Sequence, residues 1–285
     1  MYRRKKTIPY LYLAPIIILF SVLVLYPILT VIGYSFMDNV ITNKHPEFVG
    51  FANYLKVLRD AKYWKAMVNS LQFSLISMAF HMILGMGFAL MLNSNMIGPK
   101  FRGFMRAMYI LPWTFTVSIV AILWRLMLNN SGIINQIIGS NIDWFGTKQY
   151  AKWAIIFINI WCSFPFYMIS ILAGLQGISP TYYEAASIDG ANGIQSFLHI
   201  TLPQLKPVLI SLMLLDFIWS MQQLSLTYIT TGGGPAGSSE TLGTYTYNLA
   251  FSKYKFSLAS TSAVLIMIVC MTVAVFYVKN QTRSD

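Results

Sequence analysis

The stretch SPTYYEAASIDGANGIQSFLHITLPQLKP, residues 179–207, is the longest run of mixed polar and apolar residues in a chain otherwise dominated by apolar blocks. Pro180 predicts the start of a helix, because proline is well suited to a helix's first turn. Thr181 and Glu184 have the spacing of a capping box, in which each side chain bonds the other residue's free backbone N–H. Gly190 predicts the end of this helix, since glycine most easily adopts the left-handed conformation found at helix C-termini.

A second short helix is predicted over residues 192–199, with Ile194, Phe197 and Leu198 on one face. Pro203 then marks the entry into a new apolar segment. Two short helices joined at a glycine, between long apolar segments, indicate a segment that protrudes from a membrane and contacts a partner outside it.

The composition excludes an ordinary soluble fold. Of 285 residues, 56% are hydrophobic and 10% are charged, whereas soluble domains carry about 25% charged residues. The bilayer must therefore be the solvent for most of this surface. The net charge of +11 does not indicate nucleic acid, because the basic residues are spread over segment ends and loops. Cys162 and Cys270 lie in apolar segments, so we expect neither a disulfide nor a metal framework.

Six apolar stretches are long enough to cross the hydrocarbon as helices, which takes about 20 residues each. Their continuous apolar character favours helices over the alternating strands of a barrel. We therefore predict an all-α membrane protein with one transmembrane domain covering residues 1–285. The predicted spans are residues 10–36, 69–93, 104–128, 151–174, 202–228 and 257–278.

The orientation of these spans depends on the basic residues that flank them. Lys and Arg are nearly balanced between the two sides, but the basic cluster at residues 3–6 adjoins the first span and favours an inside N-terminus. Both termini and residues 175–203 are then cytoplasmic.

Polar side chains inside two spans indicate a pathway, because polar groups are costly in lipid. Spacings of three and four residues place each set on one helical face. The fifth-span set is Asp216, Trp219, Ser220 and Gln223, and the fourth-span set is Asn159, Cys162, Ser163 and Phe166. An indole beside carboxylate, hydroxyl and amide groups suits a sugar. Packing between helices is the alternative role for each residue, and we interpret His81 as a helix-packing donor.

The loop and its flanks resemble a known family. The loop positions that match are Glu184-Ala185-Ala186, Asp189-Gly190-Ala191, Phe197, Ile200 and Leu202-Pro203. The flanking matches are Asn159-Ile160-Trp161, Phe164-Pro165 and Thr231-Gly232-Gly233-Gly234-Pro235. Together they are similar to the "EAA" loop region of ABC importer permeases. The resemblance covers nearly the whole chain and is to the carbohydrate permeases of the maltose and glycerol-phosphate type.

This resemblance implies a single permease domain with the type I ABC importer fold and a cytoplasmic coupling loop at residues 179–203. The residues implied to couple the chain to an ATPase are Glu184, Ala185, Ala186, Asp189, Gly190, Ala191 and Phe197. A purely local role, in which Glu184 caps its helix and Gly190 ends it, is the alternative that the surrounding motif disfavours.

The implied function is that of a permease subunit in an ATP-driven importer, which moves a sugar or oligosaccharide into the cytoplasm by alternating access. The implied partners are a second, homologous permease forming a heterodimer, two copies of a cytoplasmic ABC ATPase, an extracellular solute-binding protein and the lipid bilayer, without nucleic acid. The implied location is the bacterial plasma membrane, as a multi-pass protein.

Sequence motifs for catalysis are missing from the chain. It contains no P-loop and no metal-binding H-E-x-x-H, so we expect no catalytic or metal site, no enzyme activity and no cofactor. ATP and Mg²⁺ are then held by the ATPase subunits. The alternative from another class is an ion-coupled secondary sugar transporter, which would call for midplane carboxylates and paired interrupted helices.

The resemblance also aligns the two polar faces with cavity-lining positions of the family. Asn159 keeps the amide of that pattern, but Cys162 and Ser163 replace an aliphatic residue and a glycine. Asp216 lies where the family pattern has a serine. Gln223 lies where the pattern has an asparagine, and its side chain is longer by one methylene. These departures retain the polar chemistry but put maltose itself in doubt as the substrate.

Overall fold

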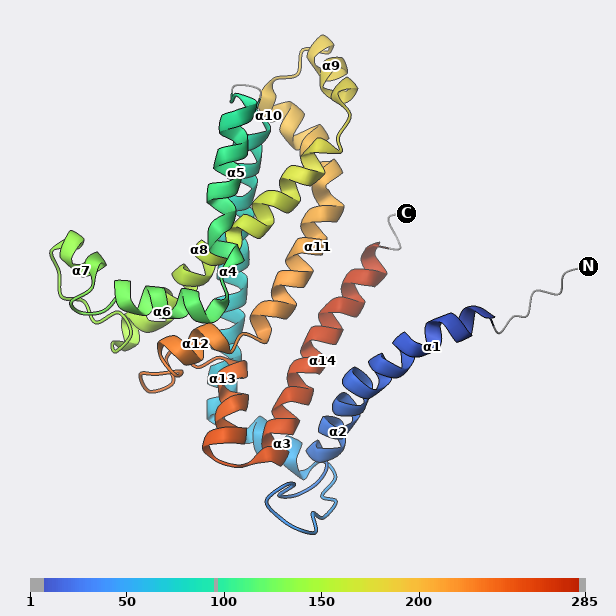
Figure 1. Ribbon diagram of the computed structural model, residues 1–285, viewed down its shortest axis with the longest axis vertical. Coiled ribbons are helices and arrows are strands. Elements are labelled where there is room, and N and C mark those ends of the chain that lie inside the picture. Colours follow the sequence, from blue (N-terminus) through green and yellow to red (C-terminus); the bar gives the residue numbers. More distant parts are fainter. Residues whose placement is uncertain (1–7, 95–96, 282–285) are drawn as a thin grey trace, which may run out of the picture. The chain divides into compact units, whose positions relative to one another are not determined.

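The computed structural model describes residues 8–94 and 97–281, and the regular structure of those residues is helical (Figure 1). An isolated bridge between Met37 and Phe48 is the only strand-like pairing in the described chain. The basic cluster at residues 3–6, on which the predicted orientation depends, lies outside the described residues.

Five helices of the described chain are long and apolar enough to cross a membrane, and a sharply bent pair of helices is a sixth candidate. This confirms the predicted all-α membrane fold. The five helical stretches are Tyr12–Ser35, Ala61–Asn93, Lys148–Gln176, Gly193–Met221 and Phe256–Lys279.

The chain forms two compact units. The first comprises the described residues up to Tyr63 together with Thr246–Ile268, and the second comprises Trp64–Tyr245 and the described residues from Val269 onward. The division falls within α14 (Phe256–Gln281), which contributes to both units.

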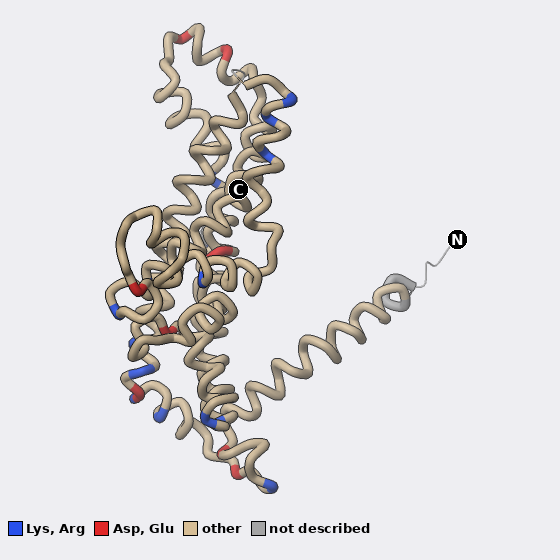
Figure 2. The backbone as a smooth tube through the Cα atoms, turned by 60° about the vertical axis from the view of Figure 1, so that its left-hand side comes forward, with Lys and Arg blue, Asp and Glu red and all other residues tan. Residues whose placement is uncertain are grey.

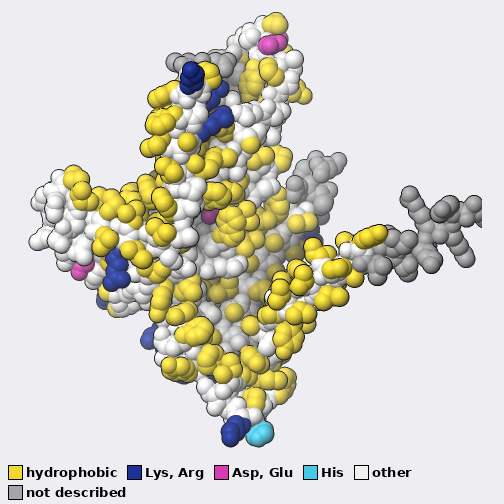
Figure 3. Space-filling model, in the orientation of Figure 1, with side chains coloured by type: hydrophobic (Ala, Val, Ile, Leu, Met, Phe, Trp, Pro, Cys, Tyr) yellow, Lys and Arg dark blue, Asp and Glu magenta, His cyan; other side chains and the backbone are white. Residues whose placement is uncertain are grey.

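The first unit contains one long apolar helix. It is formed by α1 (Ile8–Phe20), a π-helical turn (Ser21–Leu25) and α2 (Tyr26–Ser35). Most of its side chains from Tyr12 onward are apolar and exposed, and Figure 3 shows them as a largely yellow surface. Such a surface suits contact with lipid. Next along the chain, α3 (Ala52–Arg59) is tied to α2 by the Asn53 amide, which donates to the backbone oxygen of Ser35 over 3.1 Å.

The second unit is a bundle in which four helices pack together (Figure 1). They are α4 (Ala61–Asn93), α5 (Pro99–Thr114), α8 (Lys148–Gln176) and α11 (Leu202–Met221). One buried cluster joins Leu92 of α4, Met168 of α8 and Leu209 of α11. A second cluster joins α4 and α8 to the neighbouring short helices through residues such as Phe73 and Ile158.

The third predicted span is broken rather than continuous. α5 ends at Thr114, and α6 (Val117–Met127) begins after two extended residues at an angle of 93° to it. The Thr116 hydroxyl accepts a hydrogen bond from the backbone N–H of Ile119 over 3.4 Å and so caps the new helix. The prediction of one span over residues 104–128 therefore missed a nearly right-angled turn.

The fifth predicted span, residues 202–228, ends early, because α11 stops at Met221 and α12 (Ser225–Thr230) is a separate helix. A later segment of the chain packs against the connection that follows α11. The Thr241 hydroxyl donates to the Gln223 carbonyl over 2.9 Å. Gly243, in α13 (Leu242–Tyr247), lies so close to the same carbonyl that an added Cβ would meet the oxygen at 2.7 Å.

The segment between α8 and α11 forms the two predicted short helices. They are α9 (Pro180–Ile188) and α10 (Gly193–Ser196), the latter continuing through a π-helical turn (Phe197–Thr201) into α11. The second helix therefore does not end at His199. Gly190 has a φ of +80°, and the N–H of Ala191 donates to the carbonyl of Ala186 over 2.9 Å, as at a helix end closed by a left-handed glycine.

The predicted capping box at Thr181 and Glu184 is wrong, because α9 begins at Pro180 and Thr181 therefore lies inside the helix. The residue that precedes α9 is Ser179, and its side chain makes no capping bond. The box lies instead at the start of α10. The Gln195 N–H donates to the Asn192 side chain over 2.9 Å, and the Asn192 N–H donates to the Gln195 side chain over 2.8 Å.

Charged residues are sparse along the spans and gather near their ends (Figure 2). Glu184 and Asp189 lie in the α9–α10 segment. Basic residues lie near the start of α5, at the same end of the bundle. The remaining short helix, α7 (Ile133–Ile138), lies between α6 and α8 in the sequence.

Candidate functional site

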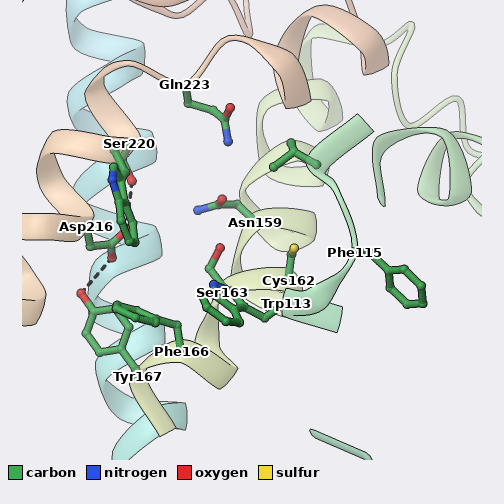
Figure 4. A pocket seen from close by; sticks show the side chains of 12 residues that line it. Trp113, Phe115, Asn159, Cys162, Ser163, Phe166, Tyr167, Asp216, Ser220 and Gln223 are labelled. Carbon is green, nitrogen blue, oxygen red and sulfur yellow. Dashed lines mark hydrogen bonds between the residues drawn. The ribbon is translucent and has the colours of Figure 1, made fainter. Parts of the chain in front are cut away.

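A cavity of about 290 Å³ lies among α5, α8 and α11 of the second unit (Figure 4). Its lining is Trp113, Phe115, Val117, Asn159, Cys162, Ser163, Phe166, Tyr167, Asp216, Trp219, Ser220 and Gln223. All eight residues that the sequence singled out on the fourth and fifth spans are therefore brought together. Figure 4 shows the amides of Asn159 and Gln223 extending into the same space.

Gln223 reaches this cavity differently from the way the sequence predicted. The prediction placed it on one helical face with Asp216, Trp219 and Ser220, but α11 ends at Met221. Gln223 instead lies in the connection to α12, where its carbonyl is held by the Thr241 hydroxyl.

A buried hydrogen-bond network forms the wall of the cavity at Asp216. One carboxylate oxygen, Oδ2, accepts from Tyr167 Oη over 2.9 Å and lies 2.8 Å from His81 Nδ1. The other oxygen, Oδ1, accepts from Ser220 Oγ over 3.2 Å. His81 is fully buried, and its Nε2 lies 3.2 Å from the backbone oxygen of Asn159. The network thus joins α4, α8 and α11, as the interpretation of His81 as a helix-packing donor requires.

Both ring nitrogens of His81 face oxygen acceptors. The tautomer of the ring decides which nitrogen donates. Asp216 has three hydrogen-bonding partners around it, the His81 ring and the hydroxyls of Tyr167 and Ser220. The cavity consequently presents a carboxyl group whose oxygens already have partners within the protein.

Three aromatic rings line the cavity in series. Trp113 of α5 stacks on Phe166 of α8 with ring centroids 5.4 Å apart, and Phe166 contacts Trp219 of α11 at 5.5 Å. The Trp219 side chain is 51% exposed, so a ring face is open to a ligand. Cys162 ties the same wall to α5 by donating its thiol to the carbonyl of Pro112 over 3.5 Å. Such rings can pack on the C–H faces of a polyhydroxylated ligand.

Four lining residues were missed by the sequence reasoning: Trp113, Phe115, Val117 and Tyr167. The first three flank the break between α5 and α6, which the sequence did not predict. Tyr167 directly follows Phe166, so it falls at the edge of the helical face, and its hydroxyl points at a carboxylate 49 residues away.

The second candidate region is the α9–α10 segment, and Tyr183 ties it together by a 2.9 Å hydrogen bond to Thr201. Glu184, Ala185 and Ala186 lie in α9, and Asp189, Gly190 and Ala191 form the connection to α10. Phe197 begins the π-helical turn that leads to α11. The structure therefore places the seven proposed coupling residues within one short segment.

A hollow of about 610 Å³ adjoins this segment. Its lining is Leu90, Asn93, Leu175, Tyr183, Ala191, Gly193, Ile194, Ser196, Phe197 and Thr201. Large apolar side chains also project from the segment, with Ile188 86% exposed and Ile194 73% exposed. Exposed apolar groups on a short, internally bonded segment are typical of a contact surface for another protein.

Residues 81–284 match the family model described as the inner membrane component of binding-protein-dependent transport systems. The chain belongs to this family. It is 34% identical to the trehalose/maltose transport system permease protein MalF of Thermococcus litoralis, over 99% of this chain and 96% of the relative. It is 32% identical to the lactose transport system permease protein LacF of Rhizobium radiobacter, over 96% of this chain and 94% of the relative.

The permease fold is also found among solved structures. A chain of a bacterial ABC transporter that imports the acidic polysaccharide alginate superposes with a TM-score of 0.79, over 96% of this permease and 94% of that chain, at 23% identity. Family and fold together confirm the predicted type I importer permease architecture. They also confirm that the chain is a multi-pass membrane subunit rather than an ATPase.

Metal-ligating and thiol groups of this permease are dispersed. Among the described residues, no group of three or more His, Cys, Asp or Glu side chains is arranged to hold a metal ion. Cys162 and Cys270 are both buried, free thiols.

Proposed function

We propose that this permease forms the membrane pathway of an ATP-driven importer that moves an uncharged sugar or oligosaccharide into the cytoplasm. The observation that carries the proposal is the single cavity in which amide, hydroxyl and aromatic groups from α8 and α11 converge. The relatives named for trehalose/maltose and lactose transport support a carbohydrate.

The cavity chemistry favours a neutral ligand over an acidic one. No Lys or Arg belongs to its lining in the described chain, so a carboxylated or sulfonated sugar would find no positive partner there. The Asp216 oxygens are already hydrogen-bonded to His81, Tyr167 and Ser220, so the carboxyl group offers little to a further ligand. The Asn159 and Gln223 amides stay available to bond sugar hydroxyls. The faces of the aromatic rings that line the cavity stay available to pack on sugar C–H groups.

The α9–α10 segment is the part of the permease that contacts the ATPase subunits. Two copies of a cytoplasmic ABC ATPase hold ATP and Mg²⁺, and one of them receives the segment in a groove, as in other helix-in-groove contacts. The exposed Ile188 and Ile194 supply apolar anchors for that groove. A second, homologous permease subunit completes the pathway, and an extracellular binding protein delivers the sugar across the bacterial plasma membrane.

Alternating access follows from differential contacts. ATP can shift the permease between inward-facing and outward-facing states only through interactions that differ between the two. The segment continues without a break through a π-helical turn into α11, which carries Asp216 and Trp219. Movement of the segment with the ATPase therefore reaches the cavity along one continuous helix, and hydrolysis of ATP reverses it.

Transport by proteoliposomes tests this function. The permease is reconstituted with its partner permease, ATPase and binding protein, and uptake of labelled neutral and acidic sugars is measured. We expect uptake of a neutral sugar that requires internal ATP and binding protein and persists when ionophores collapse all ion gradients. A non-hydrolysable ATP analogue serves as the control and should give no turnover.

Two outcomes would contradict the proposal. Uptake that proceeds without ATP and stops with an ionophore would identify an ion-coupled secondary transporter. ATP-driven uptake restricted to acidic sugars would leave the importer in place but refute the neutral-ligand assignment.

A further inference from the structure

The Gln223 amide is positioned differently from other polar groups of the cavity. Asn159 lies in α8, and Asp216 and Ser220 lie in α11, so a helix fixes the backbone of each. Gln223 lies in the connection between α11 and α12, residues 222–224, yet its amide extends into the same space (Figure 4). A binding group must be held to within about 0.5 Å, which connections achieve less well than helices. Contacts from outside α11 must therefore fix this residue.

Both backbone groups of Gln223 have partners. Its N–H donates to the carbonyl of Ser220, in α11, over 3.2 Å. Its carbonyl accepts from the hydroxyl of Thr241, 18 residues later in the chain, over 2.9 Å. The second bond thus comes from the end of the connection between α12 and α13, residues 231–241. Thr241 is 2% exposed, so little water competes for this bond.

Close packing at Gly243 reinforces the same contact. A Cβ added at Gly243 would lie 2.7 Å from the backbone oxygen of Gln223 and 3.1 Å from its carbonyl carbon. Both neighbours are backbone atoms, so no side-chain rotation relieves the overlap, and the connection itself would have to shift. The glycine therefore lets the start of α13 lie directly against the backbone of Gln223.

Thr241 is itself fixed by α4. The Asn69 amide donates to the carbonyl of Glu240 over 3.0 Å, and the Ser70 hydroxyl accepts from the N–H of Leu242 over 2.8 Å. These bonds fix the residues on both sides of Thr241. Asn69 and Ser70 are buried, and neither they nor Thr241 belong to the cavity lining. A continuous series of contacts therefore runs from α4 through Thr241 to the cavity.

We propose that Thr241 is a positioning residue for sugar binding, which sets the affinity of the cavity without touching the ligand. By bonding the Gln223 carbonyl, it places the Gln223 amide where a sugar hydroxyl meets it and so reduces the ordering that binding requires. Gly243, Asn69 and Ser70 contribute through the same residue. This role rests on the proposed function, because it requires that the Gln223 amide bonds the sugar.

Sugar binding to the assembled importer tests this role. The permease, its partner permease and the ATPase are placed in nanodiscs with a non-hydrolysable ATP analogue, and binding of labelled trehalose, maltose and lactose is measured. Thr241→Val keeps the shape of the side chain but removes the hydroxyl. We expect it to weaken binding of the accepted sugar about 2- to 12-fold, as for the loss of one hydrogen bond of about 0.5–1.5 kcal/mol. Thr241→Ser keeps the hydroxyl and should restore binding.

A double variant separates positioning from a direct effect on the ligand. Gln223→Leu removes the amide and should weaken sugar binding at least as much as Thr241→Val does. Because Thr241 acts through Gln223, the two changes together should weaken binding no more than Gln223→Leu alone.

A thiol at position 223 reports the placement of this residue without any sugar. Gln223→Cys is labelled with a maleimide in the same nanodiscs, and adducts are assigned by mass spectrometry to the peptide that contains residue 223. Adding Thr241→Val or Gly243→Ala should raise the labelling rate severalfold. The first change removes one of the two backbone bonds of residue 223, and the second displaces the connection.

Thr230→Val is the matched control for Thr241→Val. Thr230 is 5% exposed, and its hydroxyl donates to the carbonyl of Leu226 over 2.7 Å, within α12 and outside the cavity lining. The variant loses a comparable buried hydrogen bond and should change neither sugar binding nor labelling at residue 223. Thermal unfolding verifies that each variant is folded.

Several results would overturn the proposal. Unchanged labelling of the Gln223→Cys thiol in both Thr241→Val and Gly243→Ala would show that residue 223 is placed without them. Unchanged sugar binding in Gln223→Leu, or additive losses in the double variant, would mean that Thr241 does not act through the amide. Equal losses in Thr230→Val would mean a general loss of stability.

Failure of the proposed function gives a different result. If neither the parent importer nor any variant binds or takes up a neutral sugar, the neutral-sugar assignment is refuted. The labelling rates at residue 223 then decide by themselves whether Thr241 positions that residue.

Discussion

The cavity among α5, α8 and α11 and the α9–α10 segment are held together in opposite ways. In the cavity, side-chain hydrogen bonds join residues far apart in sequence, such as His81 and Asp216, which are separated by 135 positions. In the segment, the side-chain bonds are local. Among the side-chain bonds described for this segment, the longest in sequence joins Tyr183 to Thr201, 18 residues apart, and the others span five residues or fewer.

This difference matches the two roles that we propose for these regions. A cavity closed by bonds between three helices changes shape only when those helices move, so its chemistry is linked to the arrangement of the spans. A segment closed by its own turns keeps its shape while it moves, so it can transmit displacement as a rigid body. Variants in the two regions should therefore fail differently, the segment in coupling to ATP and the cavity in stability or ligand affinity.

The largest effect is expected from Gly190→Pro. Gly190 has a φ of +80°, and its N–H donates to the carbonyl of Ser187 over 3.2 Å. Proline can neither adopt this φ nor donate, a combination that costs about 3 kcal/mol or more and corresponds to a factor of more than about 100 in an equilibrium. ATP-driven uptake should be abolished, while membrane insertion measured by fractionation is unchanged.

Gly139→Pro is the matched control for this prediction. Gly139 ends α7 with a φ of +67°, and its N–H donates to the carbonyl of Gln136 over 3.3 Å. The local strain is the same, but the site is remote from the α9–α10 segment in sequence. Normal uptake by Gly190→Pro, or equal loss in both variants, would remove the special role of the segment.

A slightly smaller effect is expected in the cavity, from His81→Leu. This change removes the 2.8 Å partner of the buried Asp216 Oδ2, and leaving a buried polar group without its partner costs about 1–3 kcal/mol. The purified permease should unfold at a lower temperature. His81→Asn retains a donor near the position of Nδ1 and should recover much of the loss. Equal stability of His81→Leu and the parent protein would show that the network does not hold the helices together.

The sequence predicted the grouping of the cavity residues because helical periodicity is local. Asn159, Ser163 and Phe166 recur at the spacing of one face, and Gly190 takes the left-handed conformation that its position required. The sequence did not predict the break after α5, because the turn occurs at Phe115 and Thr116, two extended residues that interrupt an otherwise continuous apolar run.

Other features depended on partners distant in sequence. The end of α11 is fixed by Thr241 and Gly243, about 20 residues later in the chain, so periodicity alone extended that span through residue 228. The pairing of His81 with Asp216 is equally invisible to local patterns. The capping box predicted at Thr181 and Glu184 is not formed, and one at Asn192 is, because spacing does not specify which residue begins a helix.

Gly85→Ala tests how tightly the cavity network depends on helix packing. A Cβ at Gly85 of α4 would lie 2.5 Å from Cβ of Tyr167 and 3.0 Å from the backbone nitrogen of Met168, so no side-chain rotation relieves the contact. Overpacking of this kind costs about 1–3 kcal/mol. It should lower thermal stability and displace the Tyr167 hydroxyl from Asp216. Gly87→Ala is the control, because an added Cβ there meets nothing within 4 Å, and it should be neutral or slightly stabilising.

The smallest effect is expected from Trp219→Ala, which removes a ring from the cavity without disturbing the buried network. Loss of aromatic packing on a sugar is worth about 0.5–1.5 kcal/mol, so the sugar concentration for half-maximal uptake should rise about 2- to 12-fold, with stability unchanged. Trp153→Ala is the matched control. Trp153 is 53% exposed against 51% for Trp219, but it lies outside the cavity lining.

The pair of tryptophan variants distinguishes a ligand surface from mere exposure. If uptake affinity falls in Trp219→Ala and not in Trp153→Ala, the ring contributes to sugar binding through its place in the cavity. Equal affinities in both variants would leave Trp219 as a packing residue, and the cavity would then bind its ligand through the Asn159 and Gln223 amides alone. A fall in both would trace the effect to assembly rather than to the sugar.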